Sequence, residues 1–127
     1  MVLPLCTAVR SLSKDICDLQ RDVASSSAAE SEGNVAETVS QRIARLQLEF
    51  QEIITSLNQV NLAPEIEQRL RPCQTEGHRR LQLLGVGAMR LRTAKQAETV
   101  EKVRSQIEGN LTQLQKFVEA MASDLCD

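Results

Sequence analysis

The chain has 127 residues and a net charge of −2 at pH 7, and a chain of this length can bury a core as one domain. Its aromatic residues are Phe50 and Phe117, with no Trp and no Tyr. Ligand pockets and binding hot spots are rich in aromatic rings, so the composition argues against a small-molecule site. A core made almost wholly of aliphatic side chains favours narrow contacts between helices instead.

The first predicted element is a helix over residues 4–23. Large apolar residues recur there at alternating gaps of four and three, a stripe typical of coiled coils. The stripe consists of Leu5, Val9, Leu12, Ile16, Leu19 and Val23. Pro4 is compatible with the first turn, where its missing N–H has no helical partner.

Residues 24–33, ASSSAAESEG, are small and polar, and we predict a flexible linker because they offer nothing to bury. Ser27 is followed three residues later by Glu30, a pattern that fits an acidophilic phosphorylation site. We favour the interpretation of an unmodified linker serine, judged from exposure and composition.

The second predicted helix covers residues 34–61. Asn34 is a candidate N-cap with Glu37 three residues later, as in a capping box, and Pro64 sets its end. The apolar stripe again has gaps of four and three. It consists of Val39, Ile43, Leu46, Phe50, Ile53, Leu57 and Val60.

After Pro64 we predict a short helix over 64–71 that ends before Pro72, followed by one long, bent helix over 75–125. The stretch between Leu91 and Val100 lacks large apolar residues, so two helices joined near 93–98 are the alternative. Leu83 and Val86 fall opposite the inner face of this segment, an arrangement expected where a helix is sandwiched between neighbours. A fourth helix of this chain or a partner helix could provide that second neighbour.

Each long segment has an apolar face of about two positions in seven, which suits a coiled coil or a slim bundle. The expected fold class is therefore all-α: an elongated three- to four-helix antiparallel bundle or coiled coil of long amphipathic helices, forming a single domain over 1–127. The stripes could close on one another or be completed by another chain. The predicted interaction seam consists of Leu12, Ile16, Leu19, Ile43, Leu46, Phe50, Ile53, Leu57, Val103, Ile107, Leu114, Val118 and Met121.

A basic patch lies between Arg69 and Lys95, where Glu76 is the single acid. The patch consists of Arg69, Arg71, Arg79, Arg80, Arg90, Arg92 and Lys95. Such a surface can meet phosphates, an anionic membrane, an acidic partner or acidic helices of the same chain. Nucleic acid is not expected, because the sequence pI is about 5.5 and stacking rings are missing.

No residue pattern indicates catalysis, a cofactor or a metal site. His78 is the single histidine and lacks a carboxylate placed to orient it as a general base. A zinc site built on Cys73 and His78 would need two further ligands that nothing nearby supplies. The GVGAMR segment departs from the G-x-G-x-x-G spacing of a phosphate-binding loop. We therefore do not expect an enzyme.

The four cysteines, Cys6, Cys17, Cys73 and Cys126, form no C-x-x-C pair. Cys6 and Cys17 would lie about 16 Å apart along one helix, too far for a disulfide, and we expect four reduced thiols. No run approaches the ~20 apolar residues of a membrane span. The apolar start MVLPLCTAV also has no basic n-region. We expect a cytoplasmic protein, which could associate with the cytoskeleton, and do not expect membrane contact.

These patterns favour a non-catalytic coiled-coil subunit or adaptor of a larger intracellular complex of the cytoskeletal, kinetochore, centrosomal or vesicle-tethering type. Its partners would be other helical subunits in a hetero-oligomer, with a homo-oligomer as the alternative. A second hypothesis is a self-contained helical bundle that binds a peptide or an anionic membrane through the basic region 69–95. A secreted four-helix cytokine is a third.

Overall fold

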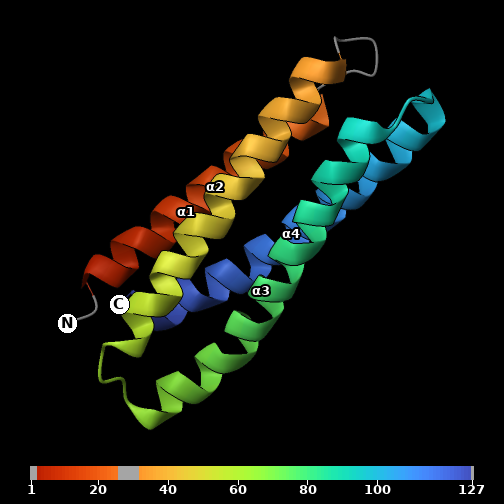
Figure 1. Cartoon of the computed structure of the whole chain (residues 1–127). Helices are drawn as coiled ribbons and strands as arrows, with labels where there is room; N and C mark the ends of the chain where they lie inside the picture. The colour runs from red at the N-terminus through yellow and green to blue at the C-terminus, as the bar shows by residue number, and fades with distance from the viewer. Residues whose placement is uncertain (1–2, 26–31, 127) are drawn as a thin grey trace.

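The computed structural model describes residues 3–25 and 32–126, and the side chains of 4–25 and 38–126. It is all-α (Figure 1). Four long helices account for most of the described residues: α1 (Leu3–Ser25), α2 (Glu32–Asn58), α3 (Pro64–Thr93) and α4 (Ala97–Leu125). Ser27, considered above as a candidate phosphorylation site, lies outside the described residues.

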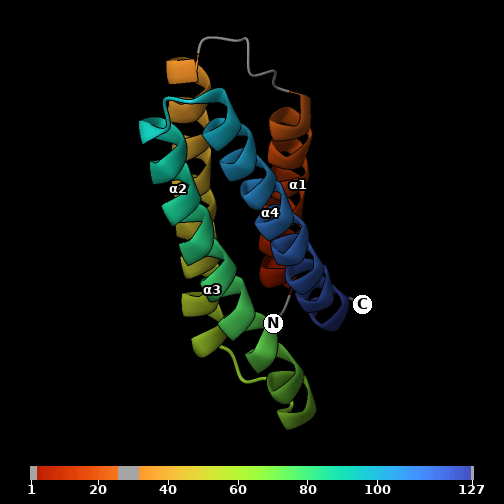
Figure 2. The same ribbon diagram turned by 90° about the vertical axis from the view of Figure 1, so that its right-hand side faces the viewer.

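The four helices form an antiparallel up-down-up-down bundle (Figures 1 and 2). Helix α1 packs against α2 and α4, and α3 packs against the same two helices. Within the described residues the diagonal pairs α1–α3 and α2–α4 make no close backbone contact. This ring of neighbours is the usual arrangement when short connections join successive helices. The start of α1 and the end of α4 consequently lie at the same end of the bundle.

The apolar stripes of the four helices cover one another and form a single hydrophobic core. All thirteen residues of the predicted seam are buried, with at most 4% of their surface exposed. Val103, Leu114 and Val118 have no exposed surface at all. Of the two arrangements left open by the sequence, closure within one chain is therefore the one that the structure shows.

Helix α3 differs from the prediction around Pro72. The predicted short helix 64–71 and the restart near Thr75 were wrong, because α3 continues through Pro72 without interruption. Pro72 is exposed, whereas its neighbours Leu70 and Cys73 are buried. Burial of those side chains compensates for the hydrogen bond that a proline removes from a helix interior. Pro64 starts the helix, as expected.

The alternative with two helices joined near 93–98 matches the structure. Helix α3 ends at Thr93, and Ala94 adopts an extended conformation with ψ of 130°. Helix α4 starts at Ala97 after Gln96, which is also extended. The other bounds shift slightly. Helix α2 begins at Glu32, so Asn34 lies inside the helix and does not cap it.

The prediction of four reduced thiols was wrong for two of the cysteines. Cys6 and Cys126 form a disulfide, with 5.1 Å between their Cα atoms. They are 120 residues apart in sequence, and they meet because α1 starts where α4 ends. Cys17 and Cys73 are free thiols. Burial, and then the charge of Asp124, raise the pKa of Cys73.

Two glycines allow α3 to approach its neighbours closely. A Cβ atom at Gly77 would lie 2.7 Å from Cζ of Phe50 on α2. A Cβ atom at Gly87 would lie 2.9 Å from Cγ1 of Ile107 on α4. Real Cβ atoms do not approach other heavy atoms so closely. Gly77 and Gly87 therefore fix which face of α3 points inward, and hence which face points outward.

Candidate interaction surface on α3

Three large apolar side chains lie exposed on one helix. Leu83, Val86 and Met89 of α3 have 39%, 54% and 66% of their surface exposed. They follow one another at intervals of three residues, so they share one face of the helix. We call these three residues the α3 stripe. Leu48 on α2, 61% exposed, is the other exposed large apolar residue of the described chain.

The packing of α3 explains why this stripe faces outward. Leu84 and Ala88 are buried at the centre of the inner face. At 100° per residue, Val86 and Met89 lie about 160° and 140° around the helix from Leu84. The sequence singled out Leu83 and Val86 as lying off the seam. Met89 was missed, although its spacing of three residues from Val86 would have shown it.

The residues of the basic patch differ in the side chains that they contact. Arg69 reaches α4, where its Nε donates to Oδ1 of Asp124 at 2.9 Å. Arg71 and Arg79 instead pair with glutamates of their own helix. The contacts run from Arg71 to Glu67 at 3.1 Å and from Arg79 to Glu76 at 3.4 Å.

The remaining basic residues have no carboxylate partner in the part of the chain that the structure describes. Arg80 donates to Oδ1 of Asn110 at 3.0 Å and Arg90 to Oε1 of Gln106 at 2.9 Å. Both acceptors are neutral amides on α4, and neither Arg92 nor Lys95 has an ion-pair partner in the described region. Pairing with acidic helices of the same chain therefore accounts for Arg69 but not for the C-terminal half of the patch.

The C-terminal half of α3, together with the connection that follows it, carries a concentrated positive charge. Residues 77–97 contain five Arg or Lys side chains and no Asp or Glu, and Lys95 lies beyond the end of α3 at Thr93. The two amide contacts hold Arg80 and Arg90 in place without neutralising them. The α3 stripe thus lies among basic residues of which Arg79 pairs with Glu76, whereas the others have no carboxylate partner in the described part of the chain.

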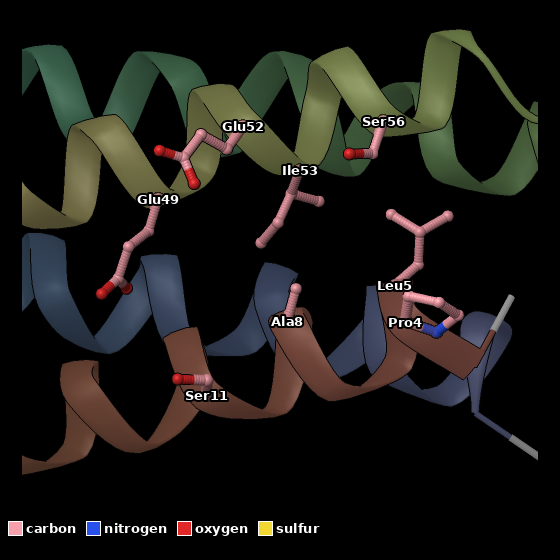
Figure 3. A pocket seen from close by; sticks show the side chains of 8 residues that line it. All are labelled: Pro4, Leu5, Ala8, Ser11, Glu49, Glu52, Ile53 and Ser56. Atoms are coloured by element: carbon pink, nitrogen blue, oxygen red, sulfur yellow. The ribbon is translucent and has the colours of Figure 1, made fainter.

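A shallow groove lies between α1 and α2 (Figure 3). It has a volume of about 300 Å³ and is lined by Pro4, Leu5, Ala8, Ser11, Glu49, Glu52, Ile53 and Ser56. The carboxyl groups of Glu49 and Glu52 are its charged members. Ser11 and Ser56 supply its hydroxyl groups, and no histidine, cysteine or lysine lines it.

The carboxyl group of Glu49 titrates near neutral pH. Its pKa is raised to about 7, chiefly by burial and then by the hydrogen bond and charge of Asp15 on α1. Arg45 opposes this shift, and Glu52 adds to it. One carboxyl oxygen of Glu49 is buried without a hydrogen-bond partner among the described residues. Sequence reasoning did not find the Asp15–Glu49 pair, because their proximity depends on the register between α1 and α2.

His78 is exposed and contacts Gln82, with 3.3 Å between the two Nε2 atoms. The described residues contain no group of three His, Cys, Asp or Glu side chains that could hold a metal ion.

In the region that the structure covers, no helix is long and apolar enough to cross a bilayer. Comparison with known family models, curated proteins and solved structures finds no match to this chain.

Proposed function

We propose that this chain is a non-catalytic adaptor: a helical bundle that closes on itself and binds another protein through the outer face of α3. The observation that carries the proposal is the α3 stripe, which leaves three large apolar side chains exposed beside basic residues that, Arg79 apart, have no carboxylate partner in the described part of the chain. Exposed apolar groups gathered on one face, rimmed by polar residues, mark protein-interaction sites.

This proposal favours the self-contained bundle over a subunit that needs a partner to fold. The seam side chains are buried by their own chain, so their stripes are not available for pairing without opening the bundle. Membership of a larger complex remains part of the proposal. The contact with that complex would use the outer surface of α3 instead of the seams.

The oligomeric state and the thermal unfolding of the isolated chain test whether it folds without a partner. We expect a monomer in analytical ultracentrifugation and one cooperative thermal transition in circular dichroism, because the core needs no second chain. A chain that is partly unfolded alone and folds only with a partner would support the subunit hypothesis instead.

The binding role is tested by charge reversal on α3. Arg79→Glu with Arg90→Glu should abolish co-purification of partners from cells, measured by quantitative mass spectrometry, without lowering the helix content. Arg10→Glu with Lys14→Glu is the matched control. It makes the same change of charge at two exposed residues of α1, which lie one turn apart. An unchanged set of co-purifying proteins would remove α3 from the binding role.

The cellular compartment can be tested separately. A cytoplasmic location, proposed from the sequence, is in tension with the Cys6–Cys126 disulfide, because structural disulfides persist mainly in oxidising compartments. Alkylation of free thiols at the moment of cell lysis, followed by mass spectrometry, would show which form exists. Alkylated Cys6 and Cys126 would support the cytoplasm, and an intact disulfide would support a secretory or extracellular location.

A further inference from the structure

The α3 stripe has the dimensions of a helix-binding surface. Leu83 and Met89 are six residues apart, a rise of about 9 Å along the axis. Together with Val86 they cover about 120° of the helix circumference. A strip that is two turns long and this narrow matches the apolar face of one further helix, which packs side chains into the spaces between such residues.

Two arginines bracket the stripe. Arg79 lies one turn before Leu83, and Arg90 lies one turn after Val86, so both share the outward face with the stripe. Arg90 is held by the amide of Gln106 at 2.9 Å and keeps its charge. Arg79 is bound only to Glu76 of its own helix at 3.4 Å in an exposed pair, and such pairs contribute little and exchange readily.

The charge disfavours a symmetric dimer through this face. A two-fold contact places the same patch of both copies together, and here each copy would bring Arg79 and Arg90 against the same two arginines. Like charges at close range oppose such a contact. The described surface also offers no second apolar stripe that would be complementary to the first, since Leu48 is isolated on α2.

A lipid surface fits less well than a protein helix. Surfaces that enter the interfacial region of a membrane commonly use Trp or Phe beside their basic residues. The α3 stripe contains no aromatic residue, and the whole chain has a net charge of −2. An anionic membrane would therefore attract one face of the bundle and repel much of the rest.

We propose that the partner of this surface is an amphipathic α-helix with acidic flanks. Its apolar face packs on Leu83, Val86 and Met89, and its Asp or Glu side chains accept hydrogen bonds from Arg79 and Arg90. This inference rests on the proposed adaptor function and specifies the chemistry of the partner. Carboxylates suit the arginines because guanidinium groups bind them in a bidentate, charge-assisted manner.

A displayed library of helical peptides tests this chemistry. Each peptide would have Leu at the a and d heptad positions and either Glu or Lys at each flanking e and g position. We expect selection on the full chain to enrich Glu at the flanks. The enriched peptide should bind about tenfold more weakly or worse to Val86→Gln with Met89→Gln, and likewise to Arg79→Glu with Arg90→Glu.

The control variant Arg10→Glu with Lys14→Glu should bind the enriched peptide as the unmodified chain does. Circular dichroism melts of all variants check that the bundle is intact, which we expect because every substituted residue is exposed.

The outcomes separate this inference from the adaptor function. Peptides could be enriched with no preference between Glu and Lys and yet lose their binding to Val86→Gln with Met89→Gln. That result would overturn the acidic partner and leave the adaptor function standing. Absence of any enriched peptide, together with unchanged co-purification in the charge-reversal variant, would overturn both. Binding to phosphatidylserine vesicles but to no peptide would replace the helix with a membrane, and self-association through α3 would replace it with a second copy.

Discussion

At the scale of single residues, the contact between Gly77 and Phe50 shows how the absence of a side chain sets the position of a helix. Phe50 is buried, with 2% of its surface exposed, and its ring occupies the space that a side chain at residue 77 would need. The sequence marked Phe50 as the centre of its stripe. The sequence alone could not identify Gly77 as its neighbour, because the proximity of Gly77 and Phe50 depends on the register between α2 and α3.

Gly77→Ala should therefore destabilise the bundle. Its Cβ would lie 2.7 Å from Cζ of Phe50, and overpacking of this kind costs about 1–3 kcal/mol. Gly109→Ala is the matched control, since nothing lies within 4 Å of its added Cβ. That control should stabilise the helix by about 0.5–1 kcal/mol. Urea unfolding measures both, and equal effects of the two substitutions would contradict the close contact.

Phe50→Ala should lower the free energy of unfolding by about 3–4 kcal/mol, because it removes a fully buried ring. If Gly77 is small to accommodate this ring, Gly77→Ala should cost much less in the Phe50→Ala background than alone. Additive losses in the double variant would show that the two residues act independently.

The carboxyl pair between α1 and α2 makes stability depend on pH. The pKa of Glu49 is raised from 4.5 to about 7 in the folded chain, so the folded state binds this proton more tightly than the unfolded state. The stabilisation that the protonated Glu49 carboxyl gives the folded state is fully present below about pH 4.5. It is lost as the pH rises through about 7.

Glu49→Gln should accordingly stabilise the protein by about 1 kcal/mol at pH 8, after allowance for solvent screening. The amide remains able to donate a hydrogen bond to Asp15 without the charge. At pH 4 the substitution should bring little gain. Thermal melts at both pH values, with exposed Glu119→Gln as the control, provide the test. A gain that is equal at the two pH values would contradict the role of the proton.

At the scale of elements, the periodic stripes and the helix start at Pro64 were predicted well, a break near 93–98 was predicted as the alternative, and the break predicted at Pro72 was wrong. Gaps of four and three report which side chains can be buried together, and burial stabilises these helices. A proline indicates only a local backbone preference against the helix interior. At Pro72 that preference lost to the burial of Leu70 and Cys73, whereas the end of α3 at Thr93 came where large apolar residues run out.

Pro72→Ala should therefore stabilise α3 by restoring a backbone hydrogen bond that the proline removes. We expect a gain of about 1–3 kcal/mol. Pro64→Ala should be nearly neutral, because a proline in the first turn removes no helical hydrogen bond. Comparison of the two melting temperatures is the measurement. A loss of stability in Pro72→Ala would mean that the ring itself is required for packing.

At the scale of the whole molecule, one covalent bond joins the first and last helices. The sequence could not predict the Cys6–Cys126 pairing, because four cysteines allow several pairings and only the closed ring of helices brings these two together. The basic patch was predicted as a group. Its division into paired and unneutralised halves depends on which residues α4 places opposite α3.

Removing the disulfide should destabilise the bundle by about 2–4 kcal/mol, because the link closes a very long loop. Cys6→Ser and reduction of the unmodified protein should give the same lower melting temperature, and reductant should have no effect on the variant. Cys17→Ser is the control, since Cys17 is an exposed free thiol. A reduced protein that melts like the oxidised one would show that helix packing alone holds the ends together.

The same bond changes how the protein responds to mechanical force. Tension applied to the chain outside Cys6 and Cys126 passes through the sulfur atoms and bypasses the helices. The 120-residue separation of these cysteines corresponds to about 400 Å of extended chain, none of which can be pulled out while the bond is intact. If a tether holds the molecule at both ends, the α3 surface stays folded and able to bind under load, and reduction turns it into an extensible link.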